Sequence, residues 1–278
     1  MTTTTTETRA AERSASRVAA RVDRPQPPSA LSASLTLGWR SVLKIRRIPE
    51  QLFDVTFQPV IFILMFVYLF GGAVSGSTQE YLQFVLPGIL VQTVVMASLY
   101  TGISLNTDIG KGIFDRFRSL PIWRPAALVG ALLADSIRYV VAAAVCLAVG
   151  MAMGFRPDGS VFDVVAAVLL VLVFAFSLSW IFAFLGLVMR SAGAVQGVSM
   201  LAMFPLTFAS NVFVDPSTMP GWLRAWVDVN PVSHLVTAVR GLMAGGPDAG
   251  DIGWSLIGCA VLIAVFAPLT VRAYRRKS

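Results

Sequence analysis

Side chains that carry out catalysis or bind metals are scarce in this sequence of 278 residues. His234 is its only histidine, and its two cysteines, Cys146 and Cys259, lie in apolar stretches without neighbouring ligand residues. A metal cluster or a Ser-His-Asp set needs more of these groups. A phosphate-binding loop is also missing, because residues 110–112 read Gly-Lys-Gly and no Ser or Thr follows the lysine. We therefore expect that the chain is not an enzyme and binds no cofactor or metal.

Charge is also scarce, since charged residues make up 13% of the chain and hydrophobic residues 56%. A water-soluble shell cannot be built from that composition. The hydrophobic residues gather in six stretches, each with the roughly 20 residues that a helix needs to cross about 30 Å of hydrocarbon. These stretches cover residues 55–74, 82–105, 126–153, 161–188, 195–214 and 252–271. The sequence predicts an all-α polytopic membrane protein with six transmembrane helices.

The Lys and Arg residues are distributed unevenly between the loops. If the N-terminus is cytoplasmic, most of them fall on cytoplasmic segments, within residues 9–47, 111–124, 190 and 272–277. The outer segments hold only Arg156, Arg224 and Arg240. The positive-inside rule therefore predicts that the N- and C-termini are both cytoplasmic. The net charge of +7 then follows from topology, and we expect no nucleic-acid partner.

The N-terminal part divides into a tail and an approach to the membrane. Residues 1–33 are rich in Thr, Ser, Ala, Arg and Pro and offer little to bury, so we expect a disordered cytoplasmic tail. Apolar residues, Trp39 among them, then recur at helical spacing, and Arg40, Lys44 and Arg47 follow an adjacent face. This pattern predicts an amphipathic helix in the headgroup layer. The helix either only anchors the chain to lipid or also contacts a cytoplasmic partner.

The cytoplasmic loop between the second and third stretches, residues 108–124, combines aromatic and basic residues in a short helical pattern. Its candidate site residues are Gly112, Ile113, Phe114, Asp115, Arg116, Phe117, Arg118, Ser119, Leu120 and Pro121. Two Phe residues and a Trp in such a loop need an apolar surface. That surface is either the bilayer or a groove on a partner protein.

Residues 215–251, on the outer side, are too long for a hairpin connection and too interrupted for a seventh crossing. Pro and Gly residues divide them into two short helical segments, Trp222–Val229 and a second one ending at Met243, with Ser233 as its expected cap. The segments form either a re-entrant pair in the outer leaflet or a hairpin on the surface. The candidate site residues of this segment are Asn230, Pro231, His234 and Arg240, and we expect a structural or capping role for His234.

The third stretch contains two ionisable residues, Asp135 and Arg138, whose i, i+3 spacing places them on one helical face. We expect an ion pair at cytoplasmic headgroup depth, because a 20-residue span that ends near Gly154 begins at Asp135. The other polar residues of the stretches either line a path or join helices. Pro205 is expected to kink the fifth helix.

Several segments together resemble ABC-2 type permeases, in particular the bacterial drug exporters of the daunorubicin-resistance type. The similarity runs from about residue 34 to the C-terminus and rests on Leu86–Gly88, Gly112–Ile122, Asp135, Met219–Leu223, Asn230–Leu235 and Arg240–Leu242. The resemblance implies that residues 34–278 form an ABC-2 transmembrane domain and that residues 112–121 form a coupling helix. That helix docks into a cleft on a separate P-loop ATPase, which binds ATP-Mg. The family also implies a second copy of the chain or a paralogous permease. It further implies an outer gate at the exit of the path, formed by a re-entrant pair of helices, with Asn230, Pro231, His234 and Arg240 as the candidate gate residues.

The sequence therefore predicts the membrane subunit of an ATP-driven exporter in a bacterial plasma membrane, with a hydrophobic or amphiphilic cargo such as a drug, antibiotic or lipid. An ion-coupled secondary transporter is the alternative. It needs ionisable relays near the midplane and usually has inverted repeats, and the sequence offers only Asp135 and Arg138. A membrane-embedded enzyme is excluded by the lack of catalytic groups.

Overall fold

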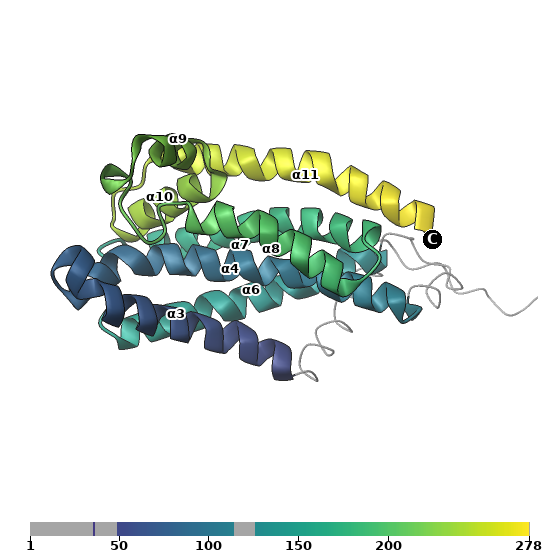
Figure 1. Ribbon diagram of the computed structural model, residues 1–278, viewed down its shortest axis with the longest axis horizontal. Coiled ribbons are helices and arrows are strands. Elements are labelled where there is room, and N and C mark those ends of the chain that lie inside the picture. Colours follow the sequence, from purple (N-terminus) through teal and green to yellow (C-terminus); the bar gives the residue numbers. More distant parts are fainter. Residues whose placement is uncertain (1–35, 37–48, 114–125, 278) are drawn as a thin grey trace, which may run out of the picture.

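Figure 1 shows the computed structural model of the chain, in which residue 36 and residues 49–113 and 126–277 are described. All regular structure in these residues is helical, as the sequence predicts. The long helices are α3 (Pro49–Ser75), α4 (Thr78–Gly110), α6 (Ala126–Ala152), α7 (Val161–Val188) and α11 (Ala249–Lys277). The shorter ones are α8 (Ala192–Phe208), the 3-10 turn η1 (Pro216–Thr218), α9 (Gly221–Val229) and α10 (Pro231–Met243).

Among the described residues, five helices are long and apolar enough to cross a membrane, and they match five of the six predicted stretches. Their spans are Thr56–Val74, Thr78–Gly110, Leu128–Ala152, Val161–Val188 and Ala249–Arg276. The remaining stretch, residues 195–214, is helical only as far as Phe208, and α8 has 17 residues. At 1.5 Å per residue, α8 is roughly 25 Å long, shorter than a hydrocarbon core of about 30 Å. The predicted length of this helix is therefore wrong at its C-terminal end.

Serine side chains determine where three of the helices begin. Ser77, Ser160 and Ser191 precede α4, α7 and α8, and each hydroxyl accepts a hydrogen bond from the backbone N–H three residues later. Asp163 completes a capping box by accepting from the backbone N–H of Ser160. These bonds satisfy N–H groups that a helix leaves without partners in its first turn. The starts of α4, α7 and α8 are thus set by local sequence.

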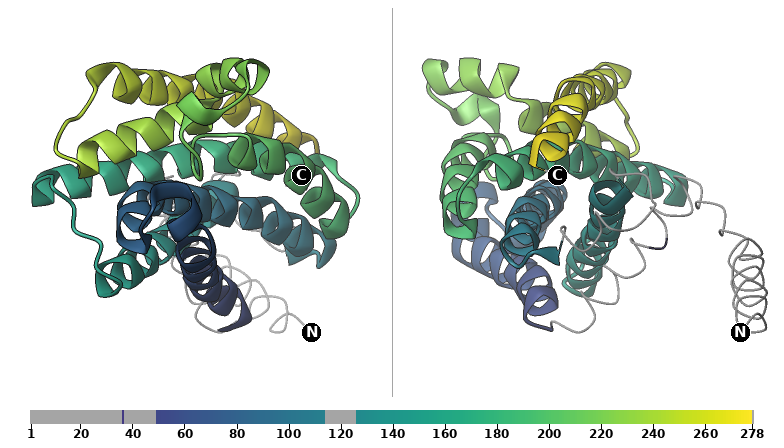
Figure 2. Two further views of the ribbon diagram at one scale, coloured as in Figure 1. Left: turned by 60° about the vertical axis from the view of Figure 1, so that its left-hand side comes forward. Right: turned by 90° about the vertical axis from the view of Figure 1, so that its right-hand side faces the viewer.

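Helix α4 is the centre of the bundle and is buried over most of its length. It packs against α3, α6, α7, α8 and α10, whereas α3 and α11 lie on opposite sides of the bundle (Figures 1 and 2). Its closest approach is to α7, where Gly102 and Gly186 bring the two backbones into contact. A Cβ atom on Gly186 would lie 2.5 Å from the carbonyl oxygen of Gly102, so a larger residue would force the helices apart. The two helices therefore cross with their backbones in contact at these glycines.

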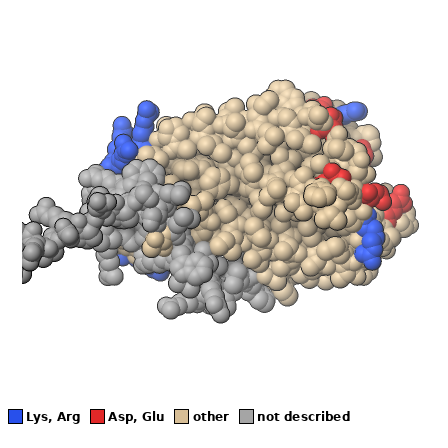
Figure 3. Space-filling view, turned by 180° about the vertical axis from the view of Figure 1, so that it is seen from behind, with Lys and Arg blue, Asp and Glu red and all other residues tan. Residues whose placement is uncertain are grey.

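The two ends of the bundle differ chemically. The capped end carries the α3–α4 turn, the loop of residues 153–160, and helices α9 and α10 (Figure 1). The basic end carries the C-terminal ends of α4 and α11 and the α7–α8 turn. In Figure 3, the charged residues visible at the basic end are Lys and Arg, Asp and Glu gather at the capped end together with some Lys or Arg, and the visible surface between is uncharged. A wide uncharged belt between two charged ends is the surface expected of a protein that spans a bilayer.

Candidate functional site at the broken end of helix α8

Helix α8 ends at Phe208, three residues after Pro205, and its last carbonyl groups are bound by a side chain from another element. The side-chain amide nitrogen of Asn230 donates to the carbonyl oxygens of Leu206 at 2.8 Å and Ala209 at 3.2 Å. Carbonyls in the last turn of a helix lack partners within the helix, so this amide satisfies groups that would otherwise stay unpaired in an apolar region. Asn230 is only 1% exposed.

The same asparagine begins α10. Its side-chain oxygen accepts from the backbone N–H of Val232 at 2.9 Å, which makes Asn230 the N-cap of that helix, with Pro231 in the first helical position. The prediction that Ser233 caps α10 is therefore wrong, and the Ser233 hydroxyl is buried without a hydrogen-bond partner in the described part of the chain. One side chain thus joins the end of α8 to the start of α10.

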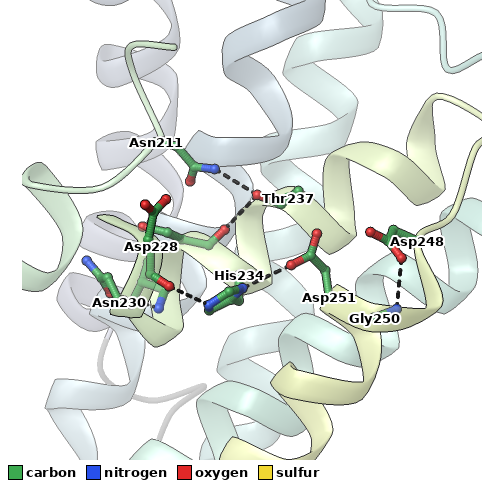
Figure 4. A network of polar contacts seen from close by, with 10 residues as sticks. Asn211, Asp228, Asn230, His234, Thr237, Asp248, Gly250 and Asp251 are labelled. Atoms are coloured by element: carbon green, nitrogen blue, oxygen red, sulfur yellow. Dashed lines mark hydrogen bonds and ion pairs between the residues drawn. The ribbon is translucent and has the colours of Figure 1, made fainter. Parts of the chain in front are cut away.

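Residues 209–214 follow α8 without regular structure, and side chains of neighbouring helices bind their carbonyl groups. Arg240 of α10 donates to the carbonyl oxygen of Asn211 at 3.0 Å, and the Tyr81 hydroxyl of α4 donates to that of Phe213 at 3.0 Å. The Asn211 amide donates in turn to the Thr237 hydroxyl at 2.8 Å (Figure 4). We call the bonds from Asn230, Arg240 and Tyr81 to residues 206–213 the α8 clasp.

Gly88 explains why this irregular segment can lie so close to α4. A Cβ atom at position 88 would lie 2.7 Å from the carbonyl oxygen of Val212 and 2.9 Å from its Cα. Because both atoms belong to the backbone, a side chain at position 88 would displace the segment. Gly88 thus has a packing role at the clasp.

Arg240 connects three parts of the structure. Besides Asn211, it donates to the carbonyl oxygen of Phe84 at 3.2 Å, and its guanidinium group lies 4.0 Å from the centre of the Phe84 ring. Burial lowers the pKa of Arg240 to about 10, although the nearby Asp215 carboxylate opposes this shift. The guanidinium group therefore stays charged at neutral pH, and it binds through backbone carbonyls and a ring face.

His234 links the two short helices to α11. Its Nδ1 lies 2.9 Å from Asp251 Oδ1, and its Nε2 lies 3.0 Å from the carbonyl oxygen of Asp228 at the end of α9 (Figure 4). The ring of Trp254 stacks beside it, with 6.3 Å between centroids. A neutral imidazole can donate to one of these oxygens, and an imidazolium can donate to both. The position fits the expected structural role, since His234 contacts α9 and α11 from α10.

The buried face of α10 is apolar. Val232, Leu235, Val236 and Val239 are all buried, and α10 packs against α4, α7 and α11. Helix α9 differs, because Trp222 and Val229 are largely exposed. The candidate gate residues Asn230, Pro231, His234 and Arg240 therefore all lie at one end of the bundle, where they join α8, α9, α10 and α11.

Asp135 and Arg138 form the predicted ion pair, with 3.1 Å between Arg138 Nη2 and Asp135 Oδ1. The guanidinium group also lies 5.5 Å from the centre of the Tyr100 ring on α4, and the Arg138 side chain is 2% exposed. The apolar span of this helix begins at Leu128, so the two residues lie roughly 10 and 15 Å along it, at 1.5 Å per residue. The helix thus extends further toward the basic end than a minimal span requires, and the headgroup depth of the pair stays a prediction.

Most other polar residues of the apolar helices bond within their own helix and are buried. The hydroxyls of Ser98, Ser177, Ser179 and Thr207 donate to carbonyls three or four residues earlier. Others join helices. The Thr101 and Tyr139 hydroxyls lie 2.9 Å apart between α4 and α6, and the Thr270 hydroxyl of α11 donates to the carbonyl oxygen of Trp180 on α7 at 3.1 Å.

Two features of the structure are absent from the sequence-based expectations. The side-chain amide of Asn106 on α4 donates to the carbonyl oxygens of Gly186 and Met189, each at 2.9 Å, at the end of α7. A series of stacked aromatic rings also runs from α3 through Phe213 to α8. The rings are Phe62, Phe66, Phe70, Phe204, Phe208 and Phe213. Long-range contacts of this kind leave no periodic signal, although an asparagine near the end of an apolar helix is itself a signal.

Much of the predicted cytoplasmic surface lies outside the described residues. This holds for residues 114–121 of the loop that follows α4, and for Trp39, Arg40, Lys44 and Arg47 of the predicted interfacial helix. Gly112 and Ile113 are described and directly follow α4, where the Gly112 N–H donates to the carbonyl oxygen of Ile109 at 2.9 Å. The roles of these residues stay predictions.

Comparison with known proteins identifies related sequences across most of the chain. Residues 33–244 match the family model described as ABC-2 type transporter. The daunorubicin resistance ABC transporter permease protein DrrB1 of Streptomyces coeruleorubidus is 55% identical over 256 residues, which are 92% of this chain and 90% of that protein. The probable doxorubicin resistance ABC transporter permease protein DrrC of Mycobacterium tuberculosis is 24% identical over 221 residues, 79% of this chain and 80% of its own length. A putative transport permease, ycf38 of Cyanophora paradoxa, is 25% identical over 206 residues, 72% of this chain and 70% of its own.

Proposed function

Because the chain belongs to the ABC-2 type transporter family, we propose that it exports hydrophobic or amphiphilic compounds with energy from ATP that a separate subunit hydrolyses. It is a multi-pass permease of the cell membrane, and the family is one of transporter subunits, not of enzymes. The observation that carries the proposal is the 55% identity, over 92% of the chain, to a permease named for daunorubicin resistance. A cargo of this class partitions into hydrocarbon and can reach the apolar faces of the helices.

The charge distribution supports an orientation with the basic end and both termini in the cytoplasm. Helices α3, α4, α6, α7 and α11 then cross the membrane, and α8 completes a further crossing together with residues 209–214. Backbone without regular structure is tolerated at membrane depth where protein satisfies its polar groups. The α8 clasp supplies these partners through Asn230, Arg240 and Tyr81.

A labelling experiment tests this topology. Cysteine at Ser217 or Ala249, in a variant without Cys146 and Cys259, is expected to react in intact cells with a thiol reagent that cannot cross the membrane. Cysteine at Ser119 is expected to stay unlabelled until the cells are opened. Labelling at only one of the two outer positions would mean that the segment between them crosses the bilayer.

The partner at the basic end is a P-loop ATPase, which binds ATP and Mg²⁺ and contacts residues 108–124. In this proposal, two copies of the permease, or one copy and a paralogous permease, sit above two ATPase subunits. Support comes from α4, whose last turn reaches the basic end and leads directly into the loop with the apolar residues Ile113, Phe114 and Phe117. Aromatic side chains ringed by charge are typical anchors in a partner's groove.

The capped end is the proposed outer gate. The packing of α10 against α4, α7 and α11 closes this end of the bundle in the present conformation. Opening a path there requires α10 to part from at least one of these helices. The bonds of Arg240 to α4 and of His234 to Asp251 on α11 are therefore the polar contacts that such a movement would have to break.

Affinity purification in mild detergent tests the proposed function most simply. We expect a P-loop ATPase to co-elute with the tagged permease in equal amount, and the complex to hydrolyse ATP. The Phe114→Ala/Phe117→Ala variant, which should insert normally, serves as the control for specific association. A permease that elutes without an ATPase, and that drives efflux from a pH gradient alone, would instead indicate an ion-coupled secondary transporter.

A further inference from the structure

Two asparagines bind helix ends in the same way, at opposite ends of the bundle. Asn106 of α4 donates its side-chain amide to Gly186 and Met189 at the C-terminal end of α7, near the basic end. Asn230 donates its amide to Leu206 and Ala209 at the C-terminal end of α8, at the capped end. All four acceptors are backbone carbonyl oxygens, at distances between 2.8 and 3.2 Å.

The chemistry of these contacts calls for an amide. The last carbonyls of a helix have no partner within the helix, and an amide NH₂ group has two donors for two such oxygens. An aspartate has no donor, and a leucine of similar size leaves both carbonyls without partners. Each asparagine therefore holds the end of a helix to a different element, Asn106 to α4 and Asn230 to α10.

Helix α8 lies between these two attachments. It follows α7 after residues 189–191 only, so Asn106 holds the point from which α8 starts. Along its length, α8 buries the single stripe Val195, Ser199, Met203 and Thr207. Its other faces are exposed, with Leu201 at 78%. The position of α8 thus depends strongly on how its two ends are held.

The element that holds the first end also leads into the proposed coupling loop. Asn106 lies one helical turn before Gly110, the last residue of α4, and the loop begins directly after it. Gly102 lies one helical turn before Asn106, on the side away from the loop. Its contact with Gly186 prevents α4 from sliding freely on α7. A displacement of the loop therefore reaches the α7–α8 turn through Asn106.

We propose that α8 is the element that transmits movement from the ATPase side to the outer gate, and that Asn106 and Asn230 are the positioning residues at its two ends. This inference rests on the proposed function, since it assumes an ATPase at the basic end. Asn106 passes displacement of α4 to the start of α8, and Asn230 passes displacement of α8 to α10. Neither residue contacts ATP or cargo.

The test compares transport with ATP hydrolysis in the purified permease–ATPase complex in liposomes. Asn106→Leu and Asn230→Leu are expected to retain the bound ATPase and its hydrolysis, while daunorubicin transported per ATP falls at least about ten-fold, a change equivalent to about 1.4 kcal/mol. The matched controls are Thr107→Val and Thr218→Val, whose hydroxyls bond to carbonyls within their own helix or turn. Both controls are expected to keep the wild-type ratio.

A distance measurement separates transmission from mere destabilisation. Spin labels at Val161 and Ser217, both exposed at the capped end, are expected to change their separation when the wild-type complex is trapped with ATP and vanadate. In Asn106→Leu this change is expected to vanish although the label sites lie at the other end of the bundle. The proposal would be overturned if both asparagine variants showed the full wild-type change in label separation, or if they transported as much daunorubicin per ATP as the wild type.

A second variant keeps the test decisive if the leucine variants do not accumulate. In Asn106→Cys/Met189→Cys, without the native cysteines, a short bis-methanethiosulfonate crosslinker, which forms a disulfide with each cysteine by displacing methanesulfinate, replaces the hydrogen bond by a covalent link. Transport per ATP is expected to be low before crosslinking and to recover after it. No recovery would contradict transmission through this contact, whereas a wild-type complex without ATP-driven transport would count against the proposed function itself.

Discussion

Replacing Gly88 by alanine is expected to loosen the α8 clasp, and the structure allows the effect to be estimated. The new Cβ atom would lie 2.7 Å from the carbonyl oxygen of Val212 and 2.9 Å from its Cα. Since both are backbone atoms, the segment of residues 209–214 must shift, which lengthens the bonds from Arg240 and Tyr81. Overpacking of this kind costs about 1–3 kcal/mol, and each weakened hydrogen bond adds about 0.5–1.5 kcal/mol.

Gly258→Ala in α11 is the matched control, because a Cβ atom there meets nothing within 4 Å. Both substitutions gain similar helix propensity, about 1 kcal/mol, so the difference between them reports the contact at Val212. One overpacked contact and two weakened hydrogen bonds together cost about 2–6 kcal/mol. At about 2–4 °C for each kcal/mol in a chain of this size, Gly88→Ala should melt roughly 4–24 °C below the control. The assay is intrinsic tryptophan fluorescence during heating in detergent. Equal melting temperatures, together with equal labelling of a cysteine at Ser217, would refute the packing argument.

Three further perturbations follow from the structure. Removing either charge of the Asp135–Arg138 pair should lower the melting temperature more than Asp135→Asn/Arg138→Leu does, because a lone buried charge is the costly state; a double variant that is worse than both singles would contradict this. Arg240→Met should destabilise the capped end by about 1–3 kcal/mol, with Arg240→Lys in between, since the carbonyls of residues 84 and 211 lose their donors; reactivity of a cysteine in the 209–214 segment reports the change. Phe114→Ala/Phe117→Ala should reduce ATPase association in pull-down by removing apolar area worth a few kcal/mol at about 25 cal/mol per Å², and undiminished association would exclude this docking surface.

Local sequence patterns were sufficient for much of the fold. Five of the six apolar stretches correspond to long apolar helices, because apolar composition over 20 or more residues leaves the backbone no partner except itself. The stretch 195–214 is helical only as far as Phe208. The pair of short helices was predicted from proline and glycine positions, and the spacing of Asp135 and Arg138 predicted their ion pair. These features depend on residues that are neighbours in sequence or one helical turn apart.

The unpredicted features depend on contacts between distant segments. The end of α8 at Phe208 is stabilised by Asn230, which lies more than 20 residues further along the chain. The contact of Asn106 with Gly186 and Met189 spans about 80 residues. The N-cap of α10 is a different case. Asparagine is a preferred N-cap and proline a preferred first helical residue, so the sequence Asn230-Pro231 by itself favours Asn230 over Ser233 as the cap.

The roles of some site residues depend on contacts with other helices, which the sequence does not reveal. His234 and Arg240 were grouped as gate residues from a resemblance, and the structure places both on α10 with bonds to other elements. Periodicity could not indicate that Arg240 binds carbonyl groups, since its partners lie on α4 and after α8. The sequence shows Gly88 only as part of the segment Leu86–Gly88, whereas the structure shows that a side chain at this position would meet the backbone of Val212.

The central claim is that ATP, hydrolysed by a partner, drives this permease. The most direct measurement follows daunorubicin uptake into inverted vesicles or liposomes that contain the purified permease–ATPase complex. The account predicts uptake that requires ATP and Mg²⁺, stops with vanadate, and continues when an ionophore collapses the transmembrane pH gradient. Uptake that persists without ATP and stops with the ionophore would contradict it.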